Sequence, residues 1–199
     1  KMKKIGILGG TFDPVHIGHT ELAKAALKQY GLDKVLFMTG GNPPHKRDIK
    51  KTDANIRHDM VKLALTDEYK IEAFDYEVNK REYTYTAKTL TELKKLHHDW
   101  EIYFIIGEDS LYDLPTWYEP QTVCQNCVLL VYPRIDNSDL DKLIKERTKE
   151  FGGDIRPINS KCINVSSTDI RRRIKMGKSI KGLVTDRVEE YINEKGLYK

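Results

Sequence analysis

Two histidines, His16 and His19, follow directly on a turn that begins at Gly9-Gly10. Glycine carries no Cβ, so a ligand can approach the backbone of this turn closely. Residues three apart share a face when both lie in one helical turn, and a helix N-terminus favours an anion through its free N–H groups and its dipole. We therefore interpret residues 9–19 as a phosphate-binding turn. A metal-binding pair and two structural histidines are the alternatives.

A second set of candidate phosphate ligands lies near the end of the chain, in residues 165–171. Ser166 followed by Asp169 three residues later is a capping-box pattern, which predicts that a helix begins here. The side chains of Ser167 and Thr168, with the free N–H groups of that helix, could bind phosphate oxygens.

Three consecutive arginines, Arg171, Arg172 and Arg173, follow these hydroxyl residues. The planar guanidinium of Arg171, one turn into the predicted helix, could contact two phosphate oxygens. Successive helical residues point about 100° apart, so the three cannot all face one ligand. We expect Arg172 and Arg173 to be solvated or salt-bridged.

The elements that must position these groups alternate between strand and helix patterns along the chain. Apolar runs predict strands at residues 4–8, 34–38, 71–74, 100–106, 128–132 and 155–158. Helical spacing of apolar residues predicts helices from about residue 20 to 30 and at 55–66, 86–96, 140–150 and 185–195, besides the one that begins at Ser166. This order predicts an α/β fold, with residues 1–199 as a single domain around a doubly wound, mostly parallel sheet.

Further candidate ligands follow other strands, at the sheet edge where open α/β folds bind ligands. After strand 100–106, Asp109 could accept hydrogen bonds from ribose hydroxyls, and Trp117 could stack on a planar ring. Thr86 begins a helix and could place N–H groups near an anion; a simple N-cap is the alternative. For Trp117 and Tyr118 the alternative is core packing.

The loop at residues 39–52 contains Pro43-Pro44, which hold an extended path and present His45 and Lys46 at the same edge. For the other basic residues of this loop we expect a solvated role.

Composition excludes several classes of protein. Hydrophobic residues make up 39% of the 199 residues and charged residues 32%, and no apolar run is long enough for a membrane span. A net charge of +4, with 34 basic residues spread among 30 acidic ones, does not favour nucleic-acid binding. Cys124 and Cys127 have CxxC spacing but no second pair or histidine cluster, so we expect a buried structural thiol rather than zinc. Reduced cysteines and the lack of a targeting signal predict a cytoplasmic protein.

Two common phosphate motifs are absent. Residues 6–10 lack the GxGxxG spacing of dinucleotide-binding turns, and Gly177-Lys178-Ser179 lacks the first glycine of a P-loop because Arg172 stands there.

His16-Ile17-Gly18-His19 resembles the HxGH signature of the nucleotidyltransferase superfamily, which includes class I aminoacyl-tRNA synthetases. Residues 165–171 resemble that superfamily's ISSTxxR signature, with Val165 in place of isoleucine. The Pro43-Pro44-His45-Lys46 segment and the pattern in residues 107–118 resemble bacterial nicotinate-nucleotide adenylyltransferases. The resemblance extends over essentially the whole chain.

The resemblance implies a Rossmann-like nucleotidyltransferase fold and adenylyl transfer from ATP to nicotinate mononucleotide, giving deamido-NAD and pyrophosphate. It implies Mg²⁺ bound mainly through substrate phosphates, no metal site on the protein, no nucleic-acid or membrane partner, and allows a homodimer. The implied catalytic residues are His16, His19 and Arg171. The implied ATP-binding residues are Gly9, Gly10, Thr11, Phe12, His16, His19, Gly107, Asp109, Ser167, Thr168 and Arg171. The implied mononucleotide-binding residues are His45, Lys46, Thr86, Asp109, Trp117 and Tyr118.

Several alternatives remain open from the sequence. A related enzyme could act on nicotinamide mononucleotide or on another phosphate acceptor. A pantetheine-phosphate adenylyltransferase or a cytidylyltransferase would share the HxGH turn, but the segment 107–118 argues against both. From other classes, the chain could be a nucleotide-binding sensor without turnover or an RNA-binding relative of the synthetases.

Overall fold

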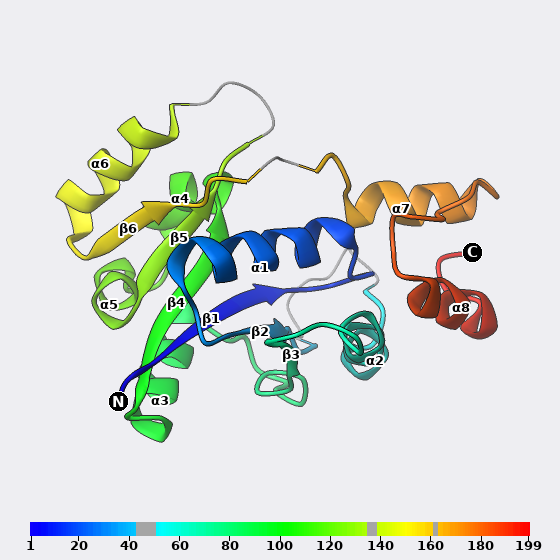
Figure 1. Ribbon diagram of the computed structural model, residues 1–199, viewed down its shortest axis with the longest axis horizontal. Coiled ribbons are helices and arrows are strands. Elements are labelled where there is room, and N and C mark those ends of the chain that lie inside the picture. Colours follow the sequence, from blue (N-terminus) through cyan, green and yellow to red (C-terminus); the bar gives the residue numbers. More distant parts are fainter. Residues whose placement is uncertain (43–50, 135–138, 161–162) are drawn as a thin grey trace. The chain divides into compact units, whose positions relative to one another are not determined.

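The computed structural model describes residues 1–42, 51–134, 139–160 and 163–199 (Figure 1). Its contacts divide the chain into two compact units. Unit 1 comprises Lys1–Gly9, Leu22–Leu36 and Thr84–Cys162, and unit 2 comprises Gly10–Glu21, Phe37–Tyr83 and Ile163–Lys199. The predicted segment Pro43-Pro44-His45-Lys46 lies outside the described residues.

Six strands form one sheet in the order β3-β2-β1-β4-β5-β6. They are β1 (Lys3–Gly10), β2 (Lys34–Thr39), β3 (Ile71–Phe74), β4 (Trp100–Gly107), β5 (Val128–Tyr132) and β6 (Asp154–Pro157). In unit 1, β1 pairs in parallel with β4, β4 with β5 and β5 with β6, with Ile5 opposite Ile102 and Leu129 opposite Ile155. The strand order reverses direction at β1, which confirms the predicted doubly wound α/β sheet.

The central strands are buried because their sequences are continuous apolar runs. Ile5 to Leu8 of β1, Ile102 to Ile106 of β4 and Leu129 to Val131 of β5 are all buried. This is the pattern expected of parallel strands that are covered on both faces. The predicted boundaries of all six strands agree with the structure to within two residues, which is the usual uncertainty of an element's ends.

The helices of unit 1 include three short elements that the sequence analysis missed. The long ones are α3 (Thr86–Leu96) and α6 (Leu140–Phe151), and the missed ones are α4 (Glu108–Asp113), a 3₁₀ turn (Leu114–Thr116) and α5 (Pro120–Asn126). Elements of three to seven residues contain too few turns for a clear helical period.

Unit 2 contains α2 (Ala54–Ala64), α7 (Ser167–Lys175) and α8 (Asp186–Lys195), and α1 (Ile17–Tyr30) begins in it. The predicted helix starts at Ser166 and Thr185 are confirmed. Ser166 Oγ accepts a hydrogen bond from Asp169 N, and Thr185 Oγ1 accepts one from Val188 N. Helix α8 packs against α2 (Figure 1), with Val188 and Ile192 buried.

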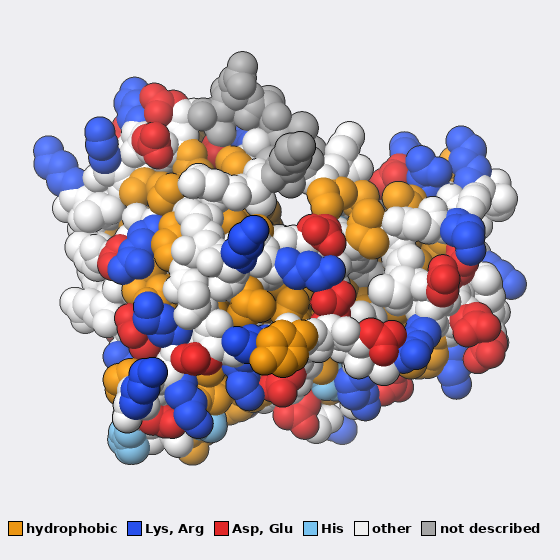
Figure 2. Space-filling view, viewed as in Figure 1, with side chains coloured by type: hydrophobic (Ala, Val, Ile, Leu, Met, Phe, Trp, Pro, Cys, Tyr) orange, Lys and Arg blue, Asp and Glu red, His pale blue; other side chains and the backbone are white. Residues whose placement is uncertain are grey.

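Acidic and basic side chains are interspersed over the face of the molecule that Figure 2 shows, with apolar side chains between them. Among the described helices, none combines the length and the apolar character that a membrane crossing requires.

Candidate active site

The glycine-rich turn runs from the end of β1 to the start of α1 at Ile17. Its one left-handed residue is Phe12, with φ of 53°, and not Gly9 or Gly10. The Phe12 ring is buried, stacks on Phe37 at 5.3 Å and meets the edge of His19 at 5.0 Å. A Cβ on Gly10 would lie 3.0 Å from this ring, so glycine at position 10 makes room for it. The ring anchors the turn in a conformation that a non-glycine residue rarely adopts.

The two histidines lie next to each other, with ring centroids 3.7 Å apart. Helix α1 begins at Ile17, so His19 lies in its first turn and His16 precedes it. His16 Nδ1 accepts a hydrogen bond from Gly18 N at 3.0 Å, and His19 Nδ1 accepts one from His16 N at 3.0 Å. Both Nδ1 atoms are thus acceptors, which leaves the proton of each neutral imidazole on Nε2.

Burial keeps both imidazoles neutral. It lowers the pKa of His16 to about 4, and it lowers the pKa of His19 well below 6.5, with a further contribution from His16. At neutral pH, each ring is therefore an uncharged N–H donor. Such a ring can hydrogen-bond a phosphate oxygen, but it adds no full positive charge.

Gly18 lies between the two histidines for a steric reason. A Cβ on this residue would lie 2.8 Å from His16 Cε1 and 2.9 Å from His16 Nδ1. Any side chain at position 18 would displace the ring of His16 from Gly18 N, so the spacing His-x-Gly-His follows from the geometry.

The second predicted motif docks onto the first one within unit 2. Ser167 Oγ donates a hydrogen bond to Pro14 O at 2.9 Å. Because this contact uses the hydroxyl proton, Ser167 could serve an anion only through its backbone N–H. Ser167 and Thr168 are the first two residues of α7, where backbone N–H groups lack helical partners.

Arg171 reaches the same turn from one turn further along α7. Its Nη1 donates to Asp13 O at 2.8 Å, and its Nη2 donates to Thr168 Oγ1 at 3.4 Å. One edge of the guanidinium is thus fixed to the turn that carries His16 and His19. The structure brings Arg171 together with both histidines in unit 2.

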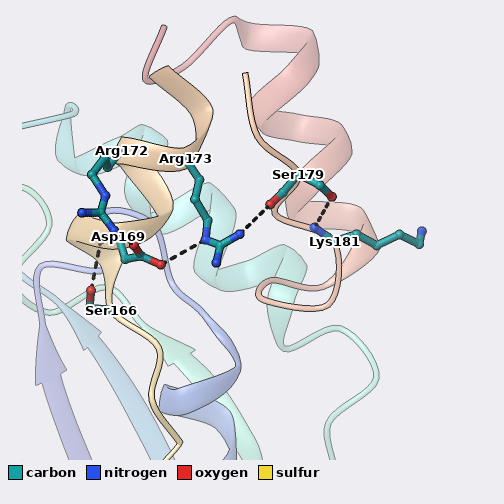
Figure 3. A network of polar contacts seen from close by, with 6 residues as sticks. All are labelled: Ser166, Asp169, Arg172, Arg173, Ser179 and Lys181. Atoms are coloured by element: carbon teal, nitrogen blue, oxygen red, sulfur yellow. Dashed lines mark hydrogen bonds and ion pairs between the residues drawn. The ribbon is translucent and has the colours of Figure 1, made fainter. Parts of the chain in front are cut away.

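The next two arginines are held elsewhere (Figure 3). Arg172 and Arg173 both form ion pairs with Asp169, the latter through Nε at 3.1 Å. Arg173 Nη1 also donates to Ser179 O at 3.4 Å. Both carboxylate oxygens of Asp169 are thus paired with arginines, which lower the pKa of Asp169. Of the two roles expected for these arginines, solvated or salt-bridged, the structure shows the salt-bridged one.

The end of β2 also contacts the glycine-rich turn. Gly40 N donates to Gly10 O at 2.9 Å. Gly41 is packed so closely that a Cβ would lie 2.4 Å from Lys80 O and 2.6 Å from Glu77 O. His45 and Lys46 follow this segment but lie outside the described residues, so their predicted role stays a prediction.

Unit 1 contains the remaining predicted ligands of ATP. Gly107 ends β4, and a Cβ there would lie 2.8 Å from the ring of Tyr132. Asp109 lies in the first turn of α4 with 72% of its side chain exposed, and it forms an ion pair with Arg134. The carboxylate is thus accessible to a ligand while it is paired with Arg134.

The predicted ligands of the mononucleotide in unit 1 lie on α3 and after the 3₁₀ turn. Helix α3 begins at Thr86, but the N-cap position is Tyr85 and no side chain caps it, so the N-cap alternative for Thr86 is wrong. Tyr118 lies beside Tyr85, with ring centroids 4.6 Å apart, and both rings are partly exposed. Trp117 is half-buried at the end of the 3₁₀ turn.

Cys124 and Cys127 have thiols that are poor nucleophiles. Burial raises the pKa of Cys124 to about 11, and burial also raises the pKa of Cys127. Cys127 Sγ donates to Val123 O at 3.2 Å. The structural role expected for these cysteines fits this environment.

The last residues of the chain make a contact with the turn that no sequence pattern predicted. Tyr198 donates its O–H to Asp13 Oδ1, while Asp13 Oδ2 accepts from Thr52 N at 3.1 Å. Burial, followed by the hydrogen bond and the charge of Asp13, raises the pKa of Tyr198 far above its usual value, so its hydroxyl remains a donor. Asp13 is itself buried. An acidic residue inside an otherwise apolar turn was the available signal for a buried, paired carboxylate.

The chain that forms this site is similar to known proteins. Residues 7–173 match the family model described as cytidylyltransferase-like. A protein of Clostridium novyi named "Probable nicotinate-nucleotide adenylyltransferase" is 43% identical over 200 residues, covering 100% of both chains. A protein of Clostridium tetani with the same name is 40% identical over 201 residues, again covering 100% of both.

The fold has close solved counterparts. The nicotinic acid mononucleotide adenylyltransferase of Plasmodium falciparum, complexed with NaAD, superposes with a TM-score of 0.79 at 22% identity, covering 98% of this chain and 97% of that one. The same enzyme complexed with APC gives a TM-score of 0.78 with the same identity and coverage. These likenesses confirm the predicted Rossmann-like nucleotidyltransferase fold. The full-length relatives, at 40% and 43% identity, show that this chain belongs to the nicotinate-nucleotide adenylyltransferase family.

Proposed function

We propose that this chain transfers the adenylyl group of ATP to nicotinate mononucleotide, forming deamido-NAD and pyrophosphate. The family supports the reaction. Within the structure, the pair of neutral imidazoles carries the proposal. Each Nδ1 is occupied by a backbone N–H, so both Nε2–H groups remain to donate to phosphate oxygens.

The reaction needs no nucleophile from the protein. An oxygen of the mononucleotide's phosphate forms a bond to the α-phosphorus of ATP, and the bond from that phosphorus to the bridging oxygen of the β-phosphate breaks. The electron pair leaves with pyrophosphate. Because a phosphate is already anionic at neutral pH, catalysis consists of positioning and of stabilising the charge that develops.

The residues of unit 2 would act on the triphosphate. His16 and His19 would donate through Nε2–H, and the backbone of residues 9–12 would lie against the phosphates. Arg171 and the N–H groups of Ser167 and Thr168 would hold the departing pyrophosphate. The hydrogen bond of Arg171 to Asp13 O supports this assignment, since it fixes the guanidinium before the substrate arrives.

Mg²⁺ would be held mainly by substrate oxygens. Within the described ranges, no cluster of three or more His, Cys, Asp or Glu side chains is arranged to hold a metal ion. Mg²⁺ usually keeps several waters and binds substrate phosphates with few protein ligands. When bound, it would neutralise part of the phosphate charge.

Of the predicted ligands of the mononucleotide, Thr86, Asp109, Trp117 and Tyr118 of unit 1 would recognise it. His45 and Lys46 stay predicted ligands, since they lie outside the described residues. Trp117 would stack on the pyridine ring, and the N–H groups near Thr86 and Tyr118 would bind the nicotinate carboxylate. A neutral amide in that place would leave a donor poorly paired, which costs about 1–3 kcal/mol. This difference would give the preference for nicotinate over nicotinamide.

The test is pyrophosphate release with ATP and Mg²⁺, comparing nicotinate and nicotinamide mononucleotides at equal concentrations. We expect a strong preference for the acid. Preference for the amide would keep the chemistry and overturn the roles of Thr86 and Tyr118. ATP binding without pyrophosphate release from either mononucleotide would instead favour a different acceptor or a nucleotide sensor.

We also propose that the reaction takes place in the cytoplasm, which is supported by the free thiols of Cys124 and Cys127. A homodimer stays a prediction, and light scattering of the purified chain would test it.

A further inference from the structure

Arg57 is a charged residue with no exposed surface. It lies on the buried face of α2 together with Met60, Val61 and Ala64, and its relative accessibility is 0%. A buried charge is strongly destabilising unless its environment satisfies it. The partners of Arg57 therefore show what the residue does.

The five N–H donors of this guanidinium meet five acceptors. Arg57 Nε donates to Thr52 O at 2.7 Å. Its Nη1 donates to Thr11 O at 2.7 Å and to Gly40 O at 3.0 Å. Its Nη2 donates to Gly41 O at 2.9 Å and to Asn42 Oδ1 at 3.3 Å. Four of the five acceptors are backbone carbonyls, and all five lie in unit 2.

These acceptors belong to three separate stretches of chain: the turn that carries His16, the end of β2, and the residue before the N-cap of α2. A second contact joins the first two stretches, because Gly40 N donates to Gly10 O. The Arg57 side chain thus contacts both stretches that flank residues 43–50, and it also contacts the proposed phosphate-binding turn.

The contacts also fix the direction of peptide groups. In a trans peptide, the C=O and the N–H point in opposite directions. Because the carbonyls of Thr11, Gly40 and Gly41 point at Arg57, the N–H groups of the residues that follow them point away from it. Oriented N–H groups of this kind stabilise developing negative charge without reorganising during the reaction.

We propose that Arg57 is a positioning residue for the reaction, which holds the phosphate-binding turn and the end of β2 in the orientation that adenylyl transfer requires. This inference rests on the proposed function. It differs from a general role in stability, because Arg57 would act on the catalytic rate of molecules that are fully folded.

The structure supplies a matched control. Arg147 of α6 is also buried, and it donates to two backbone carbonyls, Leu111 O at 3.0 Å and Tyr112 O at 2.8 Å, besides its ion pair with Glu150. Arg57→Lys and Arg147→Lys both replace a planar guanidinium with five N–H donors by an ammonium with three. Arg57 makes five hydrogen bonds in unit 2 and Arg147 makes three in unit 1, so the two variants make the same chemical change in different units.

We expect Arg57→Lys to lower kcat by about 10- to 100-fold, as misplaced catalytic groups do, while KM for both substrates changes less than about threefold. We expect Arg147→Lys to keep kcat within about twofold. Melting curves and titration of the active fraction correct both values for unfolded protein. Arg57→Gln, with two donors and no charge, should lose more activity than Arg57→Lys.

Hydrogen exchange tests the same inference without turnover. Amides in residues 10–16 and 37–42 should exchange faster in Arg57→Lys than in the wild type, and should be unchanged in Arg147→Lys. If the wild type releases no pyrophosphate, the proposed function fails, while this exchange pattern still tests the placement of the turn. Unchanged exchange, or a kcat that falls only with the folded fraction, would overturn the proposal.

Discussion

The two units hold their candidate ligands in different ways. In unit 2, backbone N–H groups of the same turn hold His16 and His19, and Asp13 O holds Arg171. In unit 1, the rings of Tyr85 and Tyr118 contact each other, and Asp109 and Tyr118 are substantially exposed. A group that stabilises charge developing in the transition state is more effective when its position is fixed before the reaction. Groups that recognise a substrate ring need an accessible face instead.

The largest expected effect comes from His19→Ala, which removes one of the groups that are fixed in unit 2. Loss of a pre-oriented donor to a transition-state oxygen lowers kcat by about 100- to 1,000-fold in comparable sites. The substitution also removes the acceptor of His16 N and the edge that contacts Phe12. Steady-state pyrophosphate release at saturating substrates measures the loss. His19→Asn, which keeps an N–H donor, should retain more activity. Near wild-type turnover in folded His19→Ala would remove the phosphate-binding role.

Trp117→Ala tests the candidate ligands of unit 1, which need an accessible face. Stacking beyond simple area burial contributes on the order of 1 kcal/mol, and the lost contact area adds to it, so KM for nicotinate mononucleotide should rise about tenfold. KM for ATP should change less than about twofold. Titrating each substrate at saturation of the other separates the two. Equal rises for both substrates would argue against ring stacking and would weaken the contrast between the units.

Tyr198→Phe tests whether the last residues of the chain help to fix the phosphate-binding turn. The substitution removes one hydrogen bond to a buried carboxylate, a change of about 1.5–3 kcal/mol in stability for a charged partner. We expect kcat to fall about fivefold, because Asp13 also accepts from Thr52 N and its carbonyl positions Arg171. Steady-state kinetics measures kcat, and chemical denaturation measures the free energy of unfolding. Tyr191→Phe, a tyrosine of α8 whose hydroxyl bonds to Asp59, is the control and should keep kcat unchanged.

These contacts also show what could be read from the sequence and what could not. The strands were predictable because a parallel strand that is buried on both faces is a continuous apolar run, as in residues 102–106. The start of α7 was predictable because a serine cap acts within three residues. The contact of Tyr198 with Asp13 joins residues from the two ends of the chain, and no local pattern indicates it.

Arg57 was missed although a signal was present. It lies three, four and seven residues before Met60, Val61 and Ala64, which places a charge on the apolar face of a predicted helix. A charge in that position is almost never buried unless it is paired. The sequence could show that Arg57 would be buried, but not that its partners would be the carbonyls of three distant stretches.

The neutral histidines predict a particular dependence on pH. Because burial holds the pKa of His16 at about 4 in the folded state, its neutral form is favoured by folding. As the pH falls below about 6.5, the usual pKa of an unfolded histidine, the unfolded chain binds protons first, and the protein loses stability until about pH 4. The rate, by contrast, should change less than about twofold between pH 8 and pH 6. A rate that rises with acid over this range would indicate a charged imidazole and a different mechanism.

The smallest effect is expected from Arg172→Ala. Although Arg172 is adjacent to Arg171, its ion pair with Asp169 is largely exposed on the Arg172 side, and exposed pairs contribute little to stability. Both kinetic constants should stay within about twofold of the wild type, whereas Arg171→Ala should lower kcat at least tenfold. The paired measurement is sensitive because the two substitutions remove the same charge from neighbouring positions of one helix. Equal losses would mean that the net charge of α7, and not the hydrogen bond of Arg171 to Asp13 O, determines how the leaving group is held.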